Sequence, residues 1–173
     1  MDATTEEEIL SSIRDFSLPR YDEIPNVGLY LEQTSKYISE YLTCLGGSPL
    51  TGSMISNYVK KGLVANPVKK QYDREQIAYL FFIAVAKSVL SMEDIRLLFS
   101  LQKQTYTPKK AYDYFCVELE NILKYIFGLK ETLDTVGNHN TETKNLLRTA
   151  IIAIGHKVYL DKHFAALHNA RKE

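Results

Sequence analysis

The ten-residue apolar run at positions 77–86, IAYLFFIAVA, constrains the fold more than any other feature of the sequence. Ten residues are too few to cross the roughly 30 Å hydrocarbon core of a bilayer. Asp73 precedes the run and is followed three positions later by Gln76, which is the arrangement of a capping box that opens a helix. The sequence therefore predicts a helix over 74–88 that is buried in a protein core and not in a membrane.

Apolar residues recur at helical spacing along most of the chain, whereas the alternation typical of strands is almost absent. Ser91 and the pair Thr107-Pro108 signal the start of two further helices. Pro67 excludes a helix between 62 and 73, and we expect a small β-hairpin arm over 68–72. The remaining helices are predicted over 5–16, 32–42, 53–61, 91–103, 107–127 and 141–169. The predicted fold class is therefore mostly α.

The charges balance over the whole chain but not within it. There are 21 basic and 21 acidic residues, a formal net charge of zero, which excludes a polycation that binds nucleic acid through a tail. Residues 1–30 carry two basic and seven acidic side chains, whereas residues 50–75 carry five basic and two acidic ones. The neutral total therefore remains compatible with a local basic face.

The stretch 51–98 holds the most informative arrangement of elements. A short polar helix ends at Gly62, a Pro- and Lys-containing arm follows, and a buried helix and a capped helix come next. This order fits a helix-turn-helix with a wing, in which the helix at 53–61 lies in the major groove of DNA and the wing at 64–72 lies on phosphates. The predicted DNA-binding residues are Ser53, Ser56, Asn57, Tyr58, Lys60, Lys61, Lys69, Lys70, Gln71, Tyr72 and Arg74.

Each of these residue types has a role in DNA binding and an ordinary alternative. Serine and asparagine can hydrogen-bond base edges or phosphates, and lysine neutralises phosphate. Asn57 either reads a base or acts in capping. Tyr58 can contact phosphate through its hydroxyl or pack against the core, and the two roles are compatible. The four lysines either contact phosphate or form a solvated surface.

The same stretch resembles the mercury-resistance-regulator (MerR) type of transcription factor. In that family the recognition helix is followed by Gly-Leu, a proline, a basic wing, a tyrosine, an Ile/Leu-rich helix and a turn into the next helix. The matching residues are Tyr58, Gly62, Leu63, Val64, Pro67, Lys69, Lys70, Tyr72, Ile77, Leu80, Ile83 and 89–95. The resemblance covers under a third of the chain and implies a homodimer that binds double-stranded, palindromic DNA.

Three positions depart from the MerR pattern. The family usually has an arginine two positions before the shared tyrosine, where this sequence has Ser56, and Asn57 replaces the first tyrosine of a pair. Lysine replaces the arginine of the wing.

The whole sequence is also similar to a bacterial family known only as a domain of unknown function, whose members are predicted to be helix-turn-helix proteins. In this sequence, the similarity is carried by the segments IPNVGLYLEQT and LTGSMISNYVKKGLV.

We therefore predict three parts: an acidic N-terminal helix and connector (1–30), a MerR-like winged helix-turn-helix domain (31–104), and a C-terminal helical hairpin (107–173) for dimerisation or effector binding.

A 4-3-4 spacing typical of coiled coils links Leu147, Ile151, Ile154 and Val158. These residues either form a dimer seam or pack on 109–127 within one chain. The tyrosines at 106, 112, 114 and 125 either line a pocket for a small-molecule effector or belong to an aromatic core or dimer seam.

The sequence contains no signature of catalysis. It lacks a Gly-rich phosphate loop, HExxH, GxSxG, CxxC and a paired-carboxylate motif, so we expect neither an enzyme nor a cofactor. His156 and His163 are two helical turns apart, about 10 Å, which is too far for one metal ion. The acidic N-terminus is no export signal, so Cys44 and Cys116 are expected to be reduced, buried thiols of a cytoplasmic protein.

The predicted function is sequence-specific DNA binding by a homodimeric transcriptional regulator. The alternative belongs to another class, because fold alone does not determine function. In it, the chain is a protein–protein interaction adaptor that uses the helix-turn-helix scaffold without binding DNA.

Overall fold

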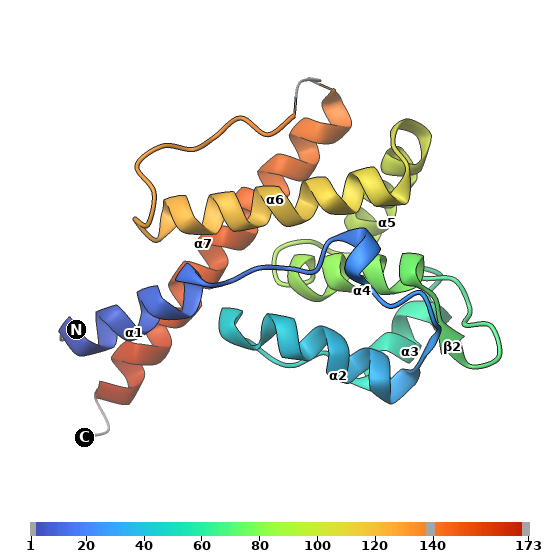
Figure 1. Cartoon of the computed structure of the whole chain (residues 1–173), viewed down its shortest axis with the longest axis horizontal. Coiled ribbons are helices and arrows are strands. Elements are labelled where there is room, and N and C mark those ends of the chain that lie inside the picture. The colour runs from blue at the N-terminus through green and yellow to red at the C-terminus, as the bar shows by residue number, and fades with distance from the viewer. Residues whose placement is uncertain (1–2, 138–140, 171–173) are drawn as a thin grey trace.

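The computed structural model describes residues 3–137 and 141–170, and this part of the chain is mostly helical. It contains seven α-helices and one small sheet of two strands (Figure 1). The helices are α1 (Ala3–Arg14), α2 (Leu31–Leu42), α3 (Gly52–Lys60), α4 (Arg74–Ala86), α5 (Met92–Thr105), α6 (Pro108–Ile126) and α7 (Glu142–Ala170). The strands are β1 (Leu29–Tyr30) and β2 (Gln71–Tyr72), and short 3-10 turns lie at Tyr21–Glu23 and Thr43–Leu45. The prediction of a mostly α fold is confirmed.

Local capping accounts for the starts of the central helices. The Asp73 carboxylate accepts a hydrogen bond from the Gln76 amide nitrogen, and the Gln76 side chain accepts one from the Asp73 amide nitrogen, both at 2.8 Å. Ser91 and Thr107 cap α5 and α6 by accepting from backbone amides three residues later. Thr51 does the same for α3. The capping box and the starts at Ser91 and Thr107 are thus confirmed.

Helix α4 is the centre of the core. Its residues Gln76–Ala78, Leu80–Ile83 and Val85–Ala86 are buried, and α2, α6 and α7 pack around it. Figure 1 shows α4 between α2 and α6. The prediction that the apolar run forms a buried helix is therefore confirmed, and no helix in residues 3–137 and 141–170 is long and apolar enough to span a membrane.

Helices α6 and α7 pack on each other, and α7 crosses α6 obliquely (Figure 1). Gly155 allows this close approach, because a Cβ at that position would lie 2.7 Å from Ile126 Cδ1 and 2.9 Å from Ile122 Cγ2. Ile151, Ile154 and Val158 are buried within the chain and Leu147 is half-buried. The structure thus shows these side chains packed within the chain, where α7 contacts α6.

A strap formed by residues 15–30 holds α1 and the rest of the chain together. It runs along α6, where the Leu18 amide donates to Glu120 and the Tyr21 amide donates to Asp113. The core is continuous from Ile9 in α1 to Val158 in α7. The three predicted parts of the chain therefore share one hydrophobic core.

The sheet joins this strap to the predicted arm. Strand β2 pairs antiparallel with β1, so that Leu29 faces Tyr72 and Tyr30 faces Gln71. Only the tip of the arm, Val68 to Gln71, folds back on itself as a hairpin turn. The expected arm over 68–72 is thus correct at its tip, whereas its base is one strand of a sheet whose other strand lies about forty positions earlier.

Candidate nucleic-acid interface

Helix α3 presents a polar face to solvent. Ser53, Ser56, Asn57, Lys60 and Lys61 are all exposed. The opposite face holds Ile55 and Tyr58, which are buried and anchor the helix to the core. Gly52 starts the helix close to α2, since a Cβ there would lie 2.7 Å from Glu32 Oε1 and 3.3 Å from the Leu31 side chain. The helix is thus fixed on one side and leaves its polar side free.

The arm carries two lysines at its tip in an unusual backbone conformation. Lys69 and Lys70 have φ angles of 51° and 64°, and Val68 and Gln71 exchange both of their backbone hydrogen bonds around them. A two-residue turn with positive φ at both positions favours Asn and Gly, because larger side chains crowd the backbone there. Lysine at both positions therefore costs conformational free energy, which points to a role for the charges.

The base of the arm is rigid. The Gln76 side-chain amide donates hydrogen bonds of 2.9 and 3.2 Å to the carbonyl oxygens of Ala65 and Asn66. Gly28 lies against the side chain of Gln71, where a Cβ would come within 2.6 Å of Gln71 Cβ. The arm is therefore held from both sides at its base, and its lysines extend into solvent.

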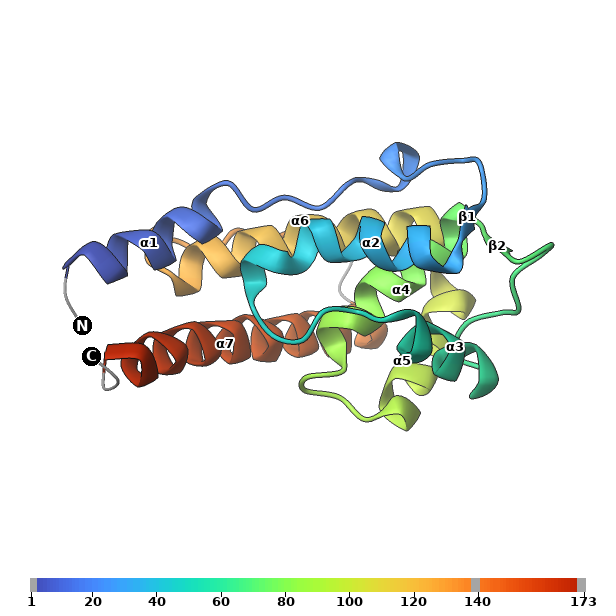
Figure 2. The ribbon, with the colours of Figure 1, turned by 90° about the horizontal axis from the view of Figure 1, so that it is seen from below.

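Helix α3 and the arm lie side by side at one end of the molecule, as Figures 1 and 2 agree. Lys60, Lys61, Lys69 and Lys70 are exposed, and none of them has an ion-pair partner among the residues that the structure describes. Unpaired ammonium groups next to a polar helix face are suited to bind an extended anion such as a nucleic-acid backbone.

Three of the predicted DNA-binding residues have other roles in the structure. Tyr58 and Tyr72 are 4% exposed, and burial raises the pKa of both hydroxyls. Arg74 donates to the carbonyl oxygens of Ile24 and Asp22 and lies over the Tyr21 ring, so it fixes the strap. The structure thus shows that Tyr58 packs against the core. We therefore leave these three out of the candidate interface. Gln71, at the base of the arm tip, is half-buried.

A second feature lies on another side of α4. Tyr106, Tyr112 and Tyr114 line a cavity between α4, α5, α6 and the start of α7, whereas Tyr125 is exposed and does not line it. Three of the four tyrosines predicted for a pocket, an aromatic core or a dimer seam border this cavity, whereas the α5 residues Phe99 and Gln102 in the same wall were not predicted.

No group of three His, Cys, Asp or Glu side chains in residues 3–137 and 141–170 could hold a metal ion.

Comparison with protein families gives one match: a model described as a domain of unknown function, DUF1836, matches residues 19–115, more than half of the chain. The chain belongs to the DUF1836 family. No curated protein and no solved structure matches it.

The DUF1836 region begins in the strap and ends in α6, so it crosses both of the boundaries predicted from the sequence, at 30 and at 104–107. It includes α3, the arm, and the walls that α4 and α5 give to the cavity. Helix α7 lies outside it. The candidate interface therefore lies wholly within the part of the chain that defines this DUF1836 protein.

Proposed function

We propose that this DUF1836 protein is a DNA-binding transcriptional regulator of MerR-like winged helix-turn-helix type. Helix α3 enters the major groove, and Lys69 and Lys70 at the arm tip contact backbone phosphates. One observation carries the proposal: four exposed lysines, two at the end of α3 and two at the arm tip, have no ion-pair partner among the described residues. No catalytic chemistry is assigned to this surface.

The side chains divide by role. Lys60, Lys61, Lys69 and Lys70 supply affinity for any sequence, because phosphate contacts carry no base information. Ser53, Ser56 and Asn57 supply the sequence preference, because short polar side chains on a helix in the major groove can reach base edges. Neither Ser56 nor Asn57 donates or accepts a side-chain hydrogen bond within the described residues, so both are free to bind a base.

The salt dependence of binding tests the phosphate contacts. The wild-type protein is first used to select bound fragments from genomic DNA. The affinity for one fragment is then measured by fluorescence anisotropy from about 50 to 200 mM salt, over which counterion release makes log K fall linearly with log salt. The variant Lys69→Gln/Lys70→Gln should reduce the magnitude of that slope by about 2, because each lost phosphate contact accounts for about 0.9.

A charge-matched control separates the arm from net charge. Lys124→Gln/Lys157→Gln removes two positive charges on α6 and α7, whereas the helix that packs on α3 is α2, and this control should leave the slope unchanged. Asn57→Ala should change which fragments are selected while the slope stays the same. Equal slopes for the arm variant and the control would exclude the arm from DNA contact, and a wild-type affinity that does not change with salt would exclude the proposal.

The second candidate function is protein binding through the same end of the molecule. Val27 and Val68 are 74% and 72% exposed, and both lie next to the sheet that carries the arm. Where exposed apolar side chains form one patch, that patch marks a protein contact, and it adds little to phosphate binding. Under this alternative the purified protein co-purifies with one protein and is not retained on heparin, whereas DNA binding predicts retention and bound nucleic acid.

A further inference from the structure

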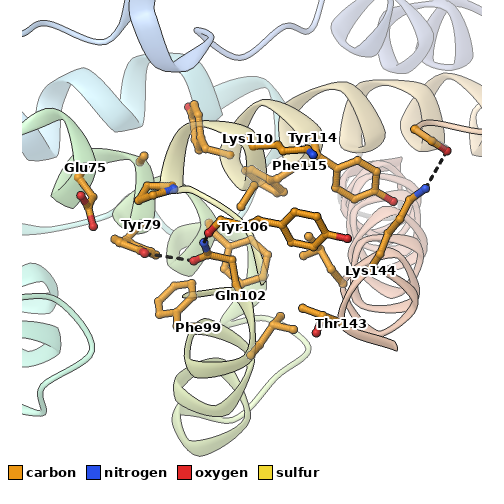
Figure 3. A pocket seen from close by; sticks show the side chains of 18 residues that line it. Glu75, Tyr79, Phe99, Gln102, Tyr106, Lys110, Tyr114, Phe115, Thr143 and Lys144 are labelled. Carbon is orange, nitrogen blue, oxygen red and sulfur yellow. Dashed lines mark hydrogen bonds between the residues drawn. The ribbon is translucent and has the colours of Figure 1, made fainter. Parts of the chain in front are cut away.

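A cavity of about 150 Å³ lies between four helices, on a different side of α4 from α2. Helices α4, α5 and α6 form its walls, and the start of α7 closes one edge (Figure 3). The cavity opens to solvent at its rim, whereas its accessible lining is almost wholly apolar. Water inside it finds few hydrogen-bond partners, so an apolar ligand can displace that water favourably.

The inner wall is aromatic. Phe99 packs edge-on against Tyr79 with ring centroids 4.6 Å apart, Phe82 packs tilted on Phe99 at 5.6 Å, and Phe115 packs edge-on against Phe82 at 5.2 Å. These four rings make a continuous series along one side of the cavity. A flat aromatic molecule can extend such a series, since aromatic rings favour edge-to-face and offset contacts.

Of the buried polar groups in the wall, the Gln102 amide is already satisfied, whereas the hydroxyls of Tyr112 and Tyr114 have no hydrogen-bond partner among the described residues. Gln102 is buried; its side-chain oxygen accepts from the Tyr79 hydroxyl at 3.1 Å, and its amide donates to the Tyr106 carbonyl at 2.7 Å. Figure 3 shows the Tyr79 bond crossing from α4 to α5. Gln102 thus holds Tyr79 and Tyr106 in place and offers little to a charged ligand, which would lose its hydration without compensation.

The charged side chains are confined to the rim. Glu75 and Lys110 are exposed, Lys144 is half-buried, and Lys110 and Lys144 lie over the rings of Tyr106 and Tyr114. The rim can hold an entering molecule but does not line the interior with charge. An uncharged ligand is therefore favoured over an aromatic acid or amine.

We propose that this cavity binds a small neutral aromatic molecule of one or two rings. The volume fits, because an engineered apolar cavity of about 150 Å³ in another protein binds benzene. The inference stands independently of DNA binding, since it uses none of the residues of α3 or the arm.

Thermal unfolding in the presence of toluene and indole tests the proposal. At a concentration 100 times its Kd, either probe should raise the Tm by about 5 °C or more through preferential binding to the folded protein. Methylcyclohexane has similar size without an aromatic ring and should bind at least tenfold more weakly than toluene. Benzoate and benzylamine, which carry a charge, should have no effect. Equal affinities for toluene and methylcyclohexane would overturn the aromatic assignment.

Two variants locate the binding site. Ala111→Phe adds a ring inside the cavity and should weaken indole binding at least tenfold, whereas Ala153→Phe on the exposed face of α7 should leave it unchanged. If Ala111→Phe does not fold, methyl NMR of the wild type gives the same answer: indole should shift the signals of Leu98 and Leu147, which line the cavity, and not that of Leu18. Binding that survives Ala111→Phe, or the absence of Leu98 and Leu147 shifts, overturns the proposal.

Discussion

Arg20 forms two parallel hydrogen bonds with Glu120, one hundred positions later in the chain, at 2.7 and 2.8 Å. The same carboxylate also accepts from the Leu18 amide at 2.9 Å. Three donors from the strap therefore meet on one side chain of α6. A paired guanidinium and carboxylate of this geometry is stronger than an ordinary surface ion pair because both partners are held in one orientation.

Glu120→Gln should therefore destabilise the protein measurably. We expect a loss of about 1–3 kcal/mol in the free energy of unfolding, because a charged hydrogen-bond acceptor is lost while its donors stay in place. Urea denaturation measures it. The control is Glu7→Gln, which breaks the exposed pair between Arg14 and Glu7 and should cost about 0.5 kcal/mol or less. Equal losses for the two variants would mean that the strap is held by apolar packing alone.

The buried carboxylate of Glu118 makes stability depend on pH. Burial raises its pKa, although Arg148 at 2.8 Å opposes the shift, and its second oxygen has no hydrogen-bond partner among the described residues. A raised pKa in the folded state means that the folded protein holds this proton more tightly than the unfolded chain. This contribution to stability is therefore present at low pH and is lost as the pH rises through the folded-state pKa.

Glu118→Gln should flatten that part of the pH profile. Unfolding free energies measured from about pH 4 to 7 should decrease less with rising pH in the variant than in the wild type. NMR titration of the Glu118 carboxyl gives the pKa directly. A value below that of a free glutamate would show that Arg148 outweighs burial.

The turn at Lys69 and Lys70 should be more stable with a different sequence. Lys69→Asn/Lys70→Gly places residues that favour positive φ at both positions and should stabilise the fold by about 1 kcal/mol. Lys69→Gln/Lys70→Gln removes the same charges but keeps the strain, so its stability should stay near that of the wild type. Thermal unfolding compares the three proteins. If Asn-Gly gives no gain, the two lysines do not strain the turn.

Gly155→Ala should destabilise the hairpin of α6 and α7. Alanine favours a helix by about 1 kcal/mol over glycine, but the new methyl group would crowd Ile122 and Ile126 at a cost of about 1–3 kcal/mol. We expect a net loss of about 1 kcal/mol by urea denaturation. Ala153→Gly, on the exposed side of the same helix, reports the propensity term alone. A gain in stability for Gly155→Ala would show that α6 can move away from α7.

Local signals predicted most of the helices, because capping and apolar spacing act within a few residues. Asp73, Ser91 and Thr107 each cap the helix that follows, as expected. Strand β1 was missed because it is two residues long and its partner lies about forty positions away. A strand that short has no alternation to detect.

Residue type alone did not predict which partners a side chain would find. Arg74 has the chemistry of a phosphate ligand, but the strap occupies it through Asp22 and Ile24. The apolar spacing of Ile151 and Ile154 showed that α7 packs against something without showing whether the partner is α6 or a second copy. The tyrosines at 106, 112 and 114 were candidates for a pocket, but the walls that α4 and α5 contribute could not be predicted, since the sequence does not encode the relative positions of helices locally.

The arrangement of the two ends of the molecule has a practical consequence. Helices α1 and α7 meet where Lys162 donates to Ser12, at the end of the molecule away from α3 and the arm (Figure 2). A fusion partner or an immobilisation tag placed beyond α1 or α7 would therefore be directed away from the four lysines. The protein can be attached to a sensor surface through either end with its basic end exposed to DNA in solution.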